Sequence, residues 1–190
     1  MQRLQAGVAR ATRLVEQLLA LAREERAGVR PRAPVELSDL VREVMEEILP
    51  LADAHDVDLG AVRTDAARVP GDRDALRVLV RNLLDNAVRH VPAGGRVDVA
   101  VERPEPASAR VALVVTDDGP GIPADERERV FDRFYRVPGS STGGSGIGLA
   151  LVRSIARHHG GEVRLADGPG GRGLQATVDL PAIGAGLSQP

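Results

Sequence analysis

The sequence predicts a domain of the α+β class that follows one long, bundle-forming helix. Three observations predict this. Several stretches carry apolar residues at helical spacing, several shorter ones alternate apolar and polar residues, and residues 1–27 repeat apolar residues at heptad-like intervals. The chain has 190 residues, of which 43% are hydrophobic and 27% charged, so it suits one domain with a packed core and an appendage.

Composition excludes several classes of function. The chain has no cysteine, which rules out disulfides and thiolate chemistry. Its net charge of −2 provides no general attraction to nucleic acid or to an anionic membrane. The longest apolar run, residues 111–115, is too short to span a bilayer, and the polar N-terminus is unlike a signal peptide. We therefore expect no nucleic-acid partner and no membrane contact for this chain.

Residues 1–27 are predicted to form the helix of a bundle. Apolar residues recur every three or four positions from Leu4 to Ala22, and further leucines widen the stripe. We expect a bundle between chains, the alternative being packing on the chain's own domain. Two prolines and a glycine predict a linker after this helix. The predicted division is a bundle helix, a linker, a domain and a tail: 1–27, 28–34, 35–182 and 183–190.

Short apolar or alternating segments bounded by turn residues are the predicted strands: 35–37, 57–62, 67–70, 96–102, 110–116, 163–166 and 174–180. Longer amphipathic segments are the predicted helices: 39–54, 73–91 and 148–159. Ser38 and Asp72 are the expected N-caps of the first two helices, and Gly160 closes the third. Strand 110–116 is almost continuously apolar, so we expect it to be central and covered on both faces. The last two strands should form a hairpin, after which the chain frays beyond Pro181.

A polar stripe on helix 73–91 is the first candidate site. Asn82, Asn86 and Arg89 lie four and three residues apart and share one helix face. Asparagine competes with backbone hydrogen bonds inside a helix, so two on one face need a reason. One interpretation is a solvated polar face. The other is the wall of a polyanion site, with an amide oxygen for a hard cation and a guanidinium for phosphate.

Two glycine motifs mark further candidate residues: Asp117-x-Gly119-x-Gly121 and Gly144-x-Gly146-x-Gly148. The first follows a buried strand, where the carboxylate can accept a hydrogen bond from an exocyclic amine and the glycines let a ligand approach the backbone. An ordinary turn is the alternative. The second opens a helix, whose free N–H groups and dipole favour an anion. It superficially matches a dinucleotide fingerprint, but no strand directly precedes it and no βαβ unit with a downstream acid follows.

The three aromatic residues lie within five positions: Phe131, Phe134 and Tyr135. Aromatic side chains usually spread through a core, because each buries a large area. Here the core must consist of Leu, Val, Ile and Ala, and the aromatics serve one local segment. The segment from Pro123 to about Thr142, which contains these aromatics and ends in glycine, serine and threonine residues, is predicted to be mobile.

Taken together and in this order, these motifs closely resemble the ATP-binding catalytic domain of sensor histidine kinases, in the superfamily of gyrase, Hsp90 and MutL. Four segments resemble the N box, the first glycine box, the F box and the second glycine box: 82–90, 117–123, 131–136 and 143–149. The resemblance covers roughly residues 35–181, and residues 1–27 resemble the second helix of the dimerisation and phosphoacceptor bundle. It implies a two-layer α/β sandwich of the Bergerat type, with a mixed sheet, helices on one face, and ATP held between helices and lid.

The resemblance implies a role for each motif. Asn86 would hold Mg²⁺ through its side-chain oxygen, with Asn82 beside the phosphates or the metal shell. Arg89 would pair with phosphate, His90 would lie against adenine, and Asp117 would accept a hydrogen bond from the adenine amino group. The residues implied to contact the nucleotide are Asn82, Asn86, Arg89, His90, Asp117, Gly119, Gly121, Ile122, Gly144, Gly146, Ile147, Gly148 and Leu149.

The aromatic segment would belong to the lid. Phe131 and Phe134 would anchor the lid or dock onto the bundle helix. Arg133 and Arg136 would reach phosphate or stay solvated as ordinary lid charges. Leu174-Gln175 replaces the small hydroxyl residues common after the last glycine, which puts any water-mediated adenine contact from there in doubt.

The family's phosphoacceptor motif, a histidine followed by an acidic residue on the first bundle helix, is missing. Of the four histidines, His55 follows a helix, although Asp56 comes next, and His90 lies in the nucleotide helix. His158 and His159 lie at a helix C-terminus, where cationic or solvated histidine is ordinary. We expect a fragment that binds Mg-ATP without phosphorylating itself and contains no catalytic residue of its own.

The predicted function is therefore the kinase domain of a two-component sensor, which transfers the γ-phosphoryl group of ATP to a histidine on a missing helix. The implied partners are a response regulator and a second copy of the parent protein. The implied location is cytoplasmic, with the parent anchored in the bacterial inner membrane. One alternative is an ATPase or an anti-sigma-like serine kinase, which would have a glutamate as general base where Asn82 stands. The other is a nucleotide-gated scaffold without catalysis.

Overall fold

The computed structural model describes residues 33–103, 108–138 and 145–183. The predicted bundle helix, most of the linker, Gly144 and residues 184–190 lie outside the described residues. In chain order the elements are β1 (Ala33–Glu36), α2 (Leu37–His55), β2 (Asp58–Thr64), β3 (Arg68–Gly71), α3 (Arg73–His90), β4 (Arg96–Glu102), β5 (Arg110–Asp117), the 3₁₀ turn η1 (Arg129–Phe131), α4 (Gly148–His158), β6 (Glu162–Asp167), η2 (Pro169–Gly171) and β7 (Leu174–Pro181).

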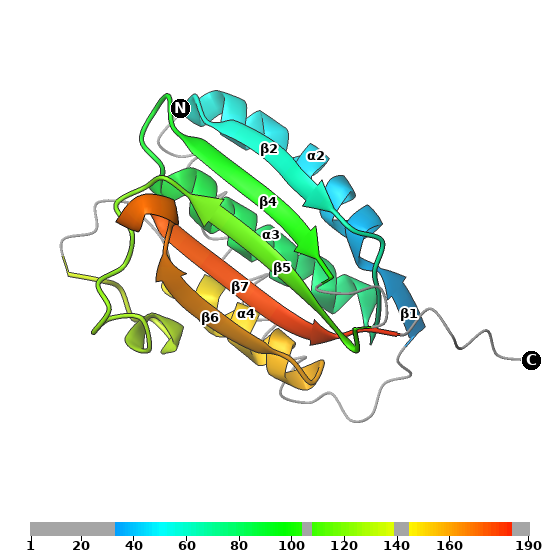
Figure 1. Ribbon diagram of the computed structural model, residues 1–190. Coiled ribbons are helices and arrows are strands. Elements are labelled where there is room, and N and C mark those ends of the chain that lie inside the picture. Colours follow the sequence, from blue (N-terminus) through cyan, green and yellow to red (C-terminus); the bar gives the residue numbers. More distant parts are fainter. Residues whose placement is uncertain (1–32, 104–107, 139–144, 184–190) are drawn as a thin grey trace, which may run out of the picture.

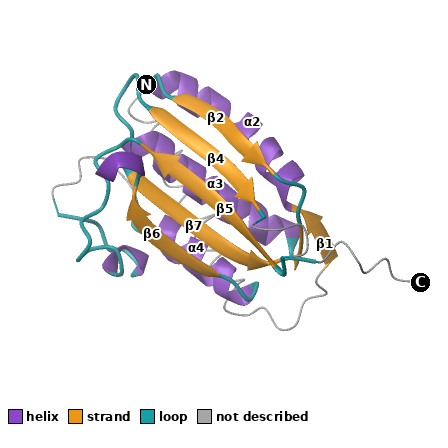
Figure 2. Cartoon of the chain, viewed as in Figure 1, coloured by secondary structure: helices purple, strands orange, loops and turns teal. Residues whose placement is uncertain are grey.

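These elements form two layers. The larger sheet has the order β2-β4-β5-β7-β6, in which β2 and β4 are parallel and the other pairs are antiparallel. The α-helices of the described residues all cover the same face of this sheet (Figure 1, Figure 2). Strands β1 and β3 form a separate antiparallel pair. The predicted α+β class, with a mixed sheet and helices on one face, is confirmed. Among the described helices, none combines the length and apolar character needed to cross a membrane.

Strand β5 is the middle strand of the sheet, as predicted, but helices cover only one of its faces. Its odd-numbered residues, from Val111 to Val115, point into the core and are buried. Its even-numbered residues, from Ala112 to Thr116, remain half-buried. The predicted cover on both faces is wrong, because no described helix lies on the outer face. The apolar run reflects the preference of valine for strands rather than a second helical layer.

The core between the layers consists of aliphatic side chains and contains no aromatic residue among the described positions. Phe131 is buried separately, where η1 packs on α4. Phe134 is 63% exposed. The prediction that the aromatics serve a local segment is therefore confirmed.

The two predicted N-caps have different outcomes. Helix α2 begins at Leu37, so the prediction of Ser38 as its N-cap is wrong; Glu36 precedes the helix and makes no capping bond with its side chain. Leu37 is completely buried and its N–H donates to a carbonyl of the β2–β3 loop at 2.8 Å, so packing sets this boundary. Asp72 caps α3 as predicted, because its side chain accepts hydrogen bonds from two N–H groups of the first turn, at 3.0 and 3.2 Å.

The chain beyond β7 is held further than expected. The N–H of Ala182 donates to Ala109 at 2.8 Å, and the N–H of Ile183 donates to Arg68 at 2.7 Å. The predicted fraying after Pro181 is wrong for these two residues, since they continue β7 toward β3.

Ion pairs between α2 and α3 fix the rotation of α3 about its axis. Arg73 pairs with Glu43 at 2.6 Å, Arg81 pairs with Glu47 at 3.1 Å, and Arg77 contacts both glutamates. Because the residue numbers of the paired side chains increase together along both helices, α2 and α3 run parallel. Each pair is partly exposed and contributes little alone, but together they determine which side of α3 faces α2.

Candidate functional site

The polar stripe of α3 lies on the side of the helix away from α2. Asn86 comes nine residues after Arg77, which places it about half a turn around the helix axis. Asn82 and Asn86 are both half-buried. The side chain of Asn82 donates to the carbonyl of Val78 at 2.8 Å. The side-chain amide of Asn86 makes no hydrogen bond to any of the described residues, so it remains available to a ligand.

Arg89 and His90, the other predicted residues of the stripe, have local partners. Arg89 pairs with Asp85 through two bonds, Nε to Oδ2 at 2.8 Å and Nη2 to Oδ1 at 3.0 Å. The Nδ1 of His90 lies 2.8 Å from the backbone oxygen of Asn86, which fixes the orientation of the ring. An incoming phosphate would therefore share Arg89 with Asp85 or displace the carboxylate.

Asp117, the last residue of β5, is a carboxylate that is only 6% exposed. Its Oδ1 accepts hydrogen bonds from the backbone N–H groups of Gly119 and Leu174, at 3.0 and 3.3 Å. Within the described residues, no donor reaches Oδ2. Burial raises the pKa of Asp117 above the ordinary value of 3.8, while the two backbone N–H groups and His90 oppose that rise. One unsatisfied acceptor therefore remains at this edge of the sheet.

Close backbone contacts hold the first glycine motif beside this carboxylate. A Cβ on Gly119 would lie 2.9 Å from both Asp117 Oδ1 and the carbonyl oxygen of His90, so the loop touches the end of α3. Gly121 has a φ of +72°, and a Cβ there would lie 2.8 Å from the carbonyl oxygen of Gly173. The motif thus bridges the end of α3 and the β6–β7 hairpin.

Arg127 fixes the same loop and was not among the predicted site residues. Its Nε donates to the carbonyl oxygen of Ile122 at 3.0 Å, and its guanidinium also pairs with Asp167 at the end of β6. Ile122, a predicted nucleotide contact, is half-buried. Sequence motifs do not mark Arg127, because its contacts depend on where β6 ends in space.

The described part of the second glycine motif packs on the aromatic segment. Gly146 has a φ of +69°, and a Cβ there would lie 2.7 Å from the carbonyl oxygen of Tyr135. Ile147 is completely buried, and its N–H donates to the Ser145 hydroxyl at 3.3 Å, so this structure leaves no surface of this predicted nucleotide contact exposed. Gly148 and Leu149 are half-buried in the first turn of α4.

The two candidate helices are antiparallel neighbours. His159, directly after α4, accepts a hydrogen bond through Nε2 from the N–H of Asp72, directly before α3, at 3.1 Å. Helix α4 has 11 residues and is about 16 Å long. Over that length α3 extends from its start to about Leu83. The first turn of α4 therefore lies level with Asn82 and Asn86, at the end of the sandwich where β5 ends (Figure 1).

His159 also corrects a prediction, because it is buried rather than cationic or solvated. Its Nδ1 lies 2.8 Å from the carbonyl oxygen of Ile155. Since Nε2 accepts a hydrogen bond, Nδ1 must carry the proton, and the imidazole is neutral.

His158 is exposed, as expected, with Nδ1 3.0 Å from the carbonyl oxygen of Ser154. His55 is the last residue of α2 rather than the residue after it.

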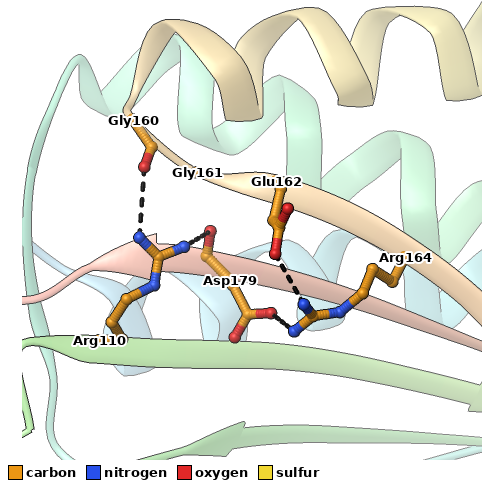
Figure 3. A pocket seen from close by; sticks show the side chains of 6 residues that line it. All are labelled: Arg110, Gly160, Gly161, Glu162, Arg164 and Asp179. Atoms are coloured by element: carbon orange, nitrogen blue, oxygen red, sulfur yellow. Dashed lines mark hydrogen bonds and ion pairs between the residues drawn. The ribbon is translucent and has the colours of Figure 1, made fainter.

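A pocket of about 400 Å³ lies at the opposite end of the sheet (Figure 3). It is lined by Arg110, Gly160, Gly161, Glu162, Arg164 and Asp179. Arg110 donates to the carbonyl oxygens of Gly160 and Asp179 at 3.4 and 3.1 Å, and Arg164 pairs with Glu162 at 2.7 Å and with the Asp179 carboxylate. Arg110 of β5 thus holds the α4–β6 turn beside β7, and Arg164 of β6 pairs with β7. The predicted site residues do not line this pocket.

Comparisons with known proteins agree with this geometry. A sequence model of the family described as "Histidine kinase-, DNA gyrase B-, and HSP90-like ATPase" matches residues 71–183. The sensor protein kinase PmrB of Pseudomonas aeruginosa is 37% identical over 186 residues, which cover 97% of this chain and 38% of PmrB. The chain therefore spans about 38% of the length of this curated relative.

Solved structures show the same fold. The mycobacterial sensor histidine kinase MprB has a TM-score of 0.71 and 34% identity, covering 80% of this chain and 97% of that chain. Full-length ShkA in complex with AMPPNP has a TM-score of 0.77 and 29% identity, covering 92% of this chain and 36% of that chain.

Proposed function

Since this chain belongs to the family of histidine kinase-, DNA gyrase B- and HSP90-like ATPases, we propose that it is the ATP-binding kinase domain of a two-component sensor histidine kinase. The observation that carries the proposal is the Asp117 carboxylate, which is buried and has no donor at Oδ2 within the described residues. The exocyclic amine of adenine would supply that donor. Oδ2 is not sealed from solvent, so a ligand donor can reach it, and a hydrogen bond to a charged carboxylate is stronger than one between neutral groups.

Asp117 would also distinguish adenine from guanine. A site built to accept a hydrogen bond disfavours a ligand that presents a carbonyl oxygen at the same place. The two N–H groups on Oδ1 hold the carboxylate in one orientation before the base arrives. Gly119 and Gly121 let this loop pack against the end of α3 and the β6–β7 hairpin, and His90 would lie beside the base.

Asn86 and the N-terminus of α4 would hold the triphosphate and its Mg²⁺. The free N–H groups and the dipole of α4 favour phosphate oxygens. Asn86 fits Mg²⁺ because its amide oxygen is a hard, neutral ligand without a competing partner in the described residues. Mg²⁺ keeps several waters and takes its remaining ligands from phosphate, so one protein oxygen suffices. When bound, it would neutralise charge on the phosphates, while Arg89 would add a second positive charge.

The proposed reaction breaks the bond between the γ-phosphorus and the β–γ bridging oxygen and forms a bond from that phosphorus to a histidine nitrogen. ADP leaves, and the acceptor histidine would belong to a bundle helix supplied by the parent protein. Such transfer depends on positioning and on charge neutralisation. Both ring nitrogens of His159 already have partners, so it is unsuited as acceptor.

The proposal extends to the partners of the parent protein. A homodimer would form through the helical bundle, a response regulator would take the phosphoryl group from the histidine, and the kinase domain would act in the cytoplasm. Named sensor kinases among the relatives support these assignments.

Calorimetric titration of the chain with ATP, with and without Mg²⁺, tests the binding site. We expect Mg²⁺ to strengthen ATP binding, and Asn86→Ala to remove most of that gain while the Mg²⁺-free affinity stays within about threefold. Arg157→Gln, on an exposed position of α4, is the control and should bind as wild type. Absence of measurable binding of any adenine nucleotide would refute the proposal.

A phosphorylation assay then tests the reaction. We expect slow ATP turnover by the chain alone, because the amide of Asn82 cannot accept a proton as a general base would. A bundle helix carrying the acceptor histidine, supplied in trans, should become labelled. Rapid steady-state hydrolysis would favour an ATPase instead. Normal signalling by Asn86→Ala in the complete parent protein, wherever ATP still binds, would favour a scaffold.

A further inference from the structure

Phe134 has an unusual conformation for a large apolar residue. It is 63% exposed and has a φ of +65°, a region that favours glycine. Its N–H donates at 2.8 Å to the carbonyl oxygen of Gly146, two residues before α4 begins. A strained backbone persists only where surrounding contacts determine it, and such residues concentrate at functional sites. The turn at residues 131–135 is thus held in a fixed shape that directs Phe134 outward.

Arg153 of α4 is the second support of this turn. Its Nη2 donates to the carbonyl oxygen of Phe131 at 3.2 Å, and its guanidinium lies 4.7 Å from the centre of the Phe131 ring. Its Nη1 lies 3.6 Å from Glu128, and Nη2 lies 3.7 Å from Asp132. A planar guanidinium can stack on a ring and donate in its own plane at the same time, which an ammonium cannot do.

The position of Arg153 links this turn to the proposed phosphate site. Arg153 comes five residues after Gly148, about 7.5 Å along one continuous helix. The same rigid element therefore carries the N-terminus proposed to hold phosphates and the side chain that holds the aromatic turn. Arg153 itself is not among the residues proposed to touch the nucleotide.

From these contacts we infer that Arg153 is a positioning residue for phosphoryl transfer. It fixes the turn at 131–135 relative to the bound triphosphate, so that Phe134 meets the acceptor-bearing bundle in the geometry that transfer requires. An exposed aromatic side chain on a proposed lid is a contact surface rather than a core residue. This inference rests on the proposed kinase function. It requires that loss of Arg153 weakens transfer without weakening ATP binding in proportion.

A tryptophan reporter tests the structural half of the inference. The chain contains no tryptophan, so Phe134→Trp introduces a single fluorophore at the turn. In that background, Arg153→Gln should lower the steady-state anisotropy, and Arg153→Lys should give an intermediate value. Arg157→Gln, which removes the same charge one turn later, should leave the anisotropy unchanged. Equal anisotropy in Arg153→Gln and Arg157→Gln would overturn the inference.

The kinetic half uses the native Phe134. We expect Arg153→Gln to lower the rate of transfer to an acceptor bundle in trans by about tenfold, while the Kd for Mg-ATP changes by less than about threefold. Arg153→Lys should recover part of the rate. If circular dichroism shows that Arg153→Gln is unfolded, Arg153→Lys is compared with wild type in its place. Transfer at the wild-type rate, or a loss of ATP affinity equal to the loss of rate, would overturn the inference. Failure of the wild-type chain to bind ATP would instead refute the proposed function, and the anisotropy measurement would then decide the inference.

Discussion

The imidazole of His159 accepts a hydrogen bond from the backbone N–H of Asp72 at 3.1 Å, which joins the end of α4 to the start of α3. Asp72 also caps α3, because its side chain accepts hydrogen bonds from two N–H groups of the first turn. The ring fits tightly, because a Cβ on Gly71 would lie 2.6 Å from Cδ2 of His159. This contact sets the register of the two helices at the end opposite the proposed phosphate site.

Replacement of His159 should therefore lower the free energy of unfolding, and by more when the new side chain offers no hydrogen-bond acceptor. We expect His159→Phe, which keeps a ring but offers no acceptor, to lower the free energy of unfolding by about 2 kcal/mol. His159→Gln can place its carbonyl oxygen near the position of Nε2 and should lose less. Urea unfolding followed by circular dichroism measures both. His158→Gln, next to it and exposed, is the control, with an expected change below about 0.5 kcal/mol. Equal losses for the Phe and Gln variants would show that the bond to Asp72 contributes little.

Local chemistry explains which features were predictable from the sequence. The cap at Asp72 and the stripe of Asn82 and Asn86 depend on neighbours within a few residues, so pattern alone identifies them. The strands and helices of the domain were likewise placed within a few residues of their observed bounds. The prediction that Ser38 caps α2 was wrong, because the burial of Leu37, rather than a capping hydroxyl, sets the start of this helix.

Contacts between distant segments were not predictable in this way. His159 was expected to be solvated because its sequence neighbourhood is a helix end, and only the packing of α4 on α3 encloses it. Arg127 and Arg153 have no motif of their own; each bonds a carbonyl oxygen whose position depends on the tertiary fold. The pairing of Arg89 with Asp85 is local, but helix spacing did not indicate whether phosphate or carboxylate would occupy that guanidinium.

Asp117→Asn should separate nucleotide binding from stability. The Asn oxygen can still accept both backbone bonds, so the loop geometry is kept. The amide nitrogen would replace Oδ2 and present a donor to the donor of adenine. We expect ATP affinity to fall by about thirtyfold, equivalent to about 2 kcal/mol, while the free energy of unfolding at pH 7 stays equal or rises. Calorimetry and urea unfolding measure the two effects. A variant that binds ATP as tightly as wild type would exclude Asp117 as the adenine acceptor.

The pH dependence of stability provides a separate test of the buried carboxylate. Burial raises the pKa of Asp117 in the folded chain above 3.8, so between 3.8 and that raised value the folded state binds more protons than the unfolded state. Stability should therefore fall as pH rises through this window, and the cost is complete above it. The difference in free energy of unfolding between Asp117→Asn and wild type should be largest near pH 7 and shrink toward pH 3.8. A difference that is constant with pH would contradict the burial of a charged Asp117.

Arg127→Gln should loosen the loop at residues 119–122, which is proposed to contact adenine, rather than the hydrophobic core. Arg127 bonds the carbonyl oxygen of Ile122 and pairs with Asp167, which is largely exposed, so the carbonyl bond is the more valuable of the two. We expect ATP affinity to weaken by about fivefold and the free energy of unfolding to fall by about 1 kcal/mol or less. Arg172→Gln, on the exposed β6–β7 loop, removes the same charge nearby and should leave both quantities unchanged.

Hydrogen exchange distinguishes an effect on the loop from a general electrostatic effect in the Arg127 variant. If Arg127 holds the loop through Ile122, the amides of residues 119–122 should exchange faster in Arg127→Gln, while those of β5 keep their protection. Arg127→Lys retains the positive charge but not the planar donor, and should resemble Arg127→Gln in exchange rate. If Arg127→Lys instead matches wild type in both affinity and exchange, charge alone accounts for the role of this residue and the bond to Ile122 is incidental.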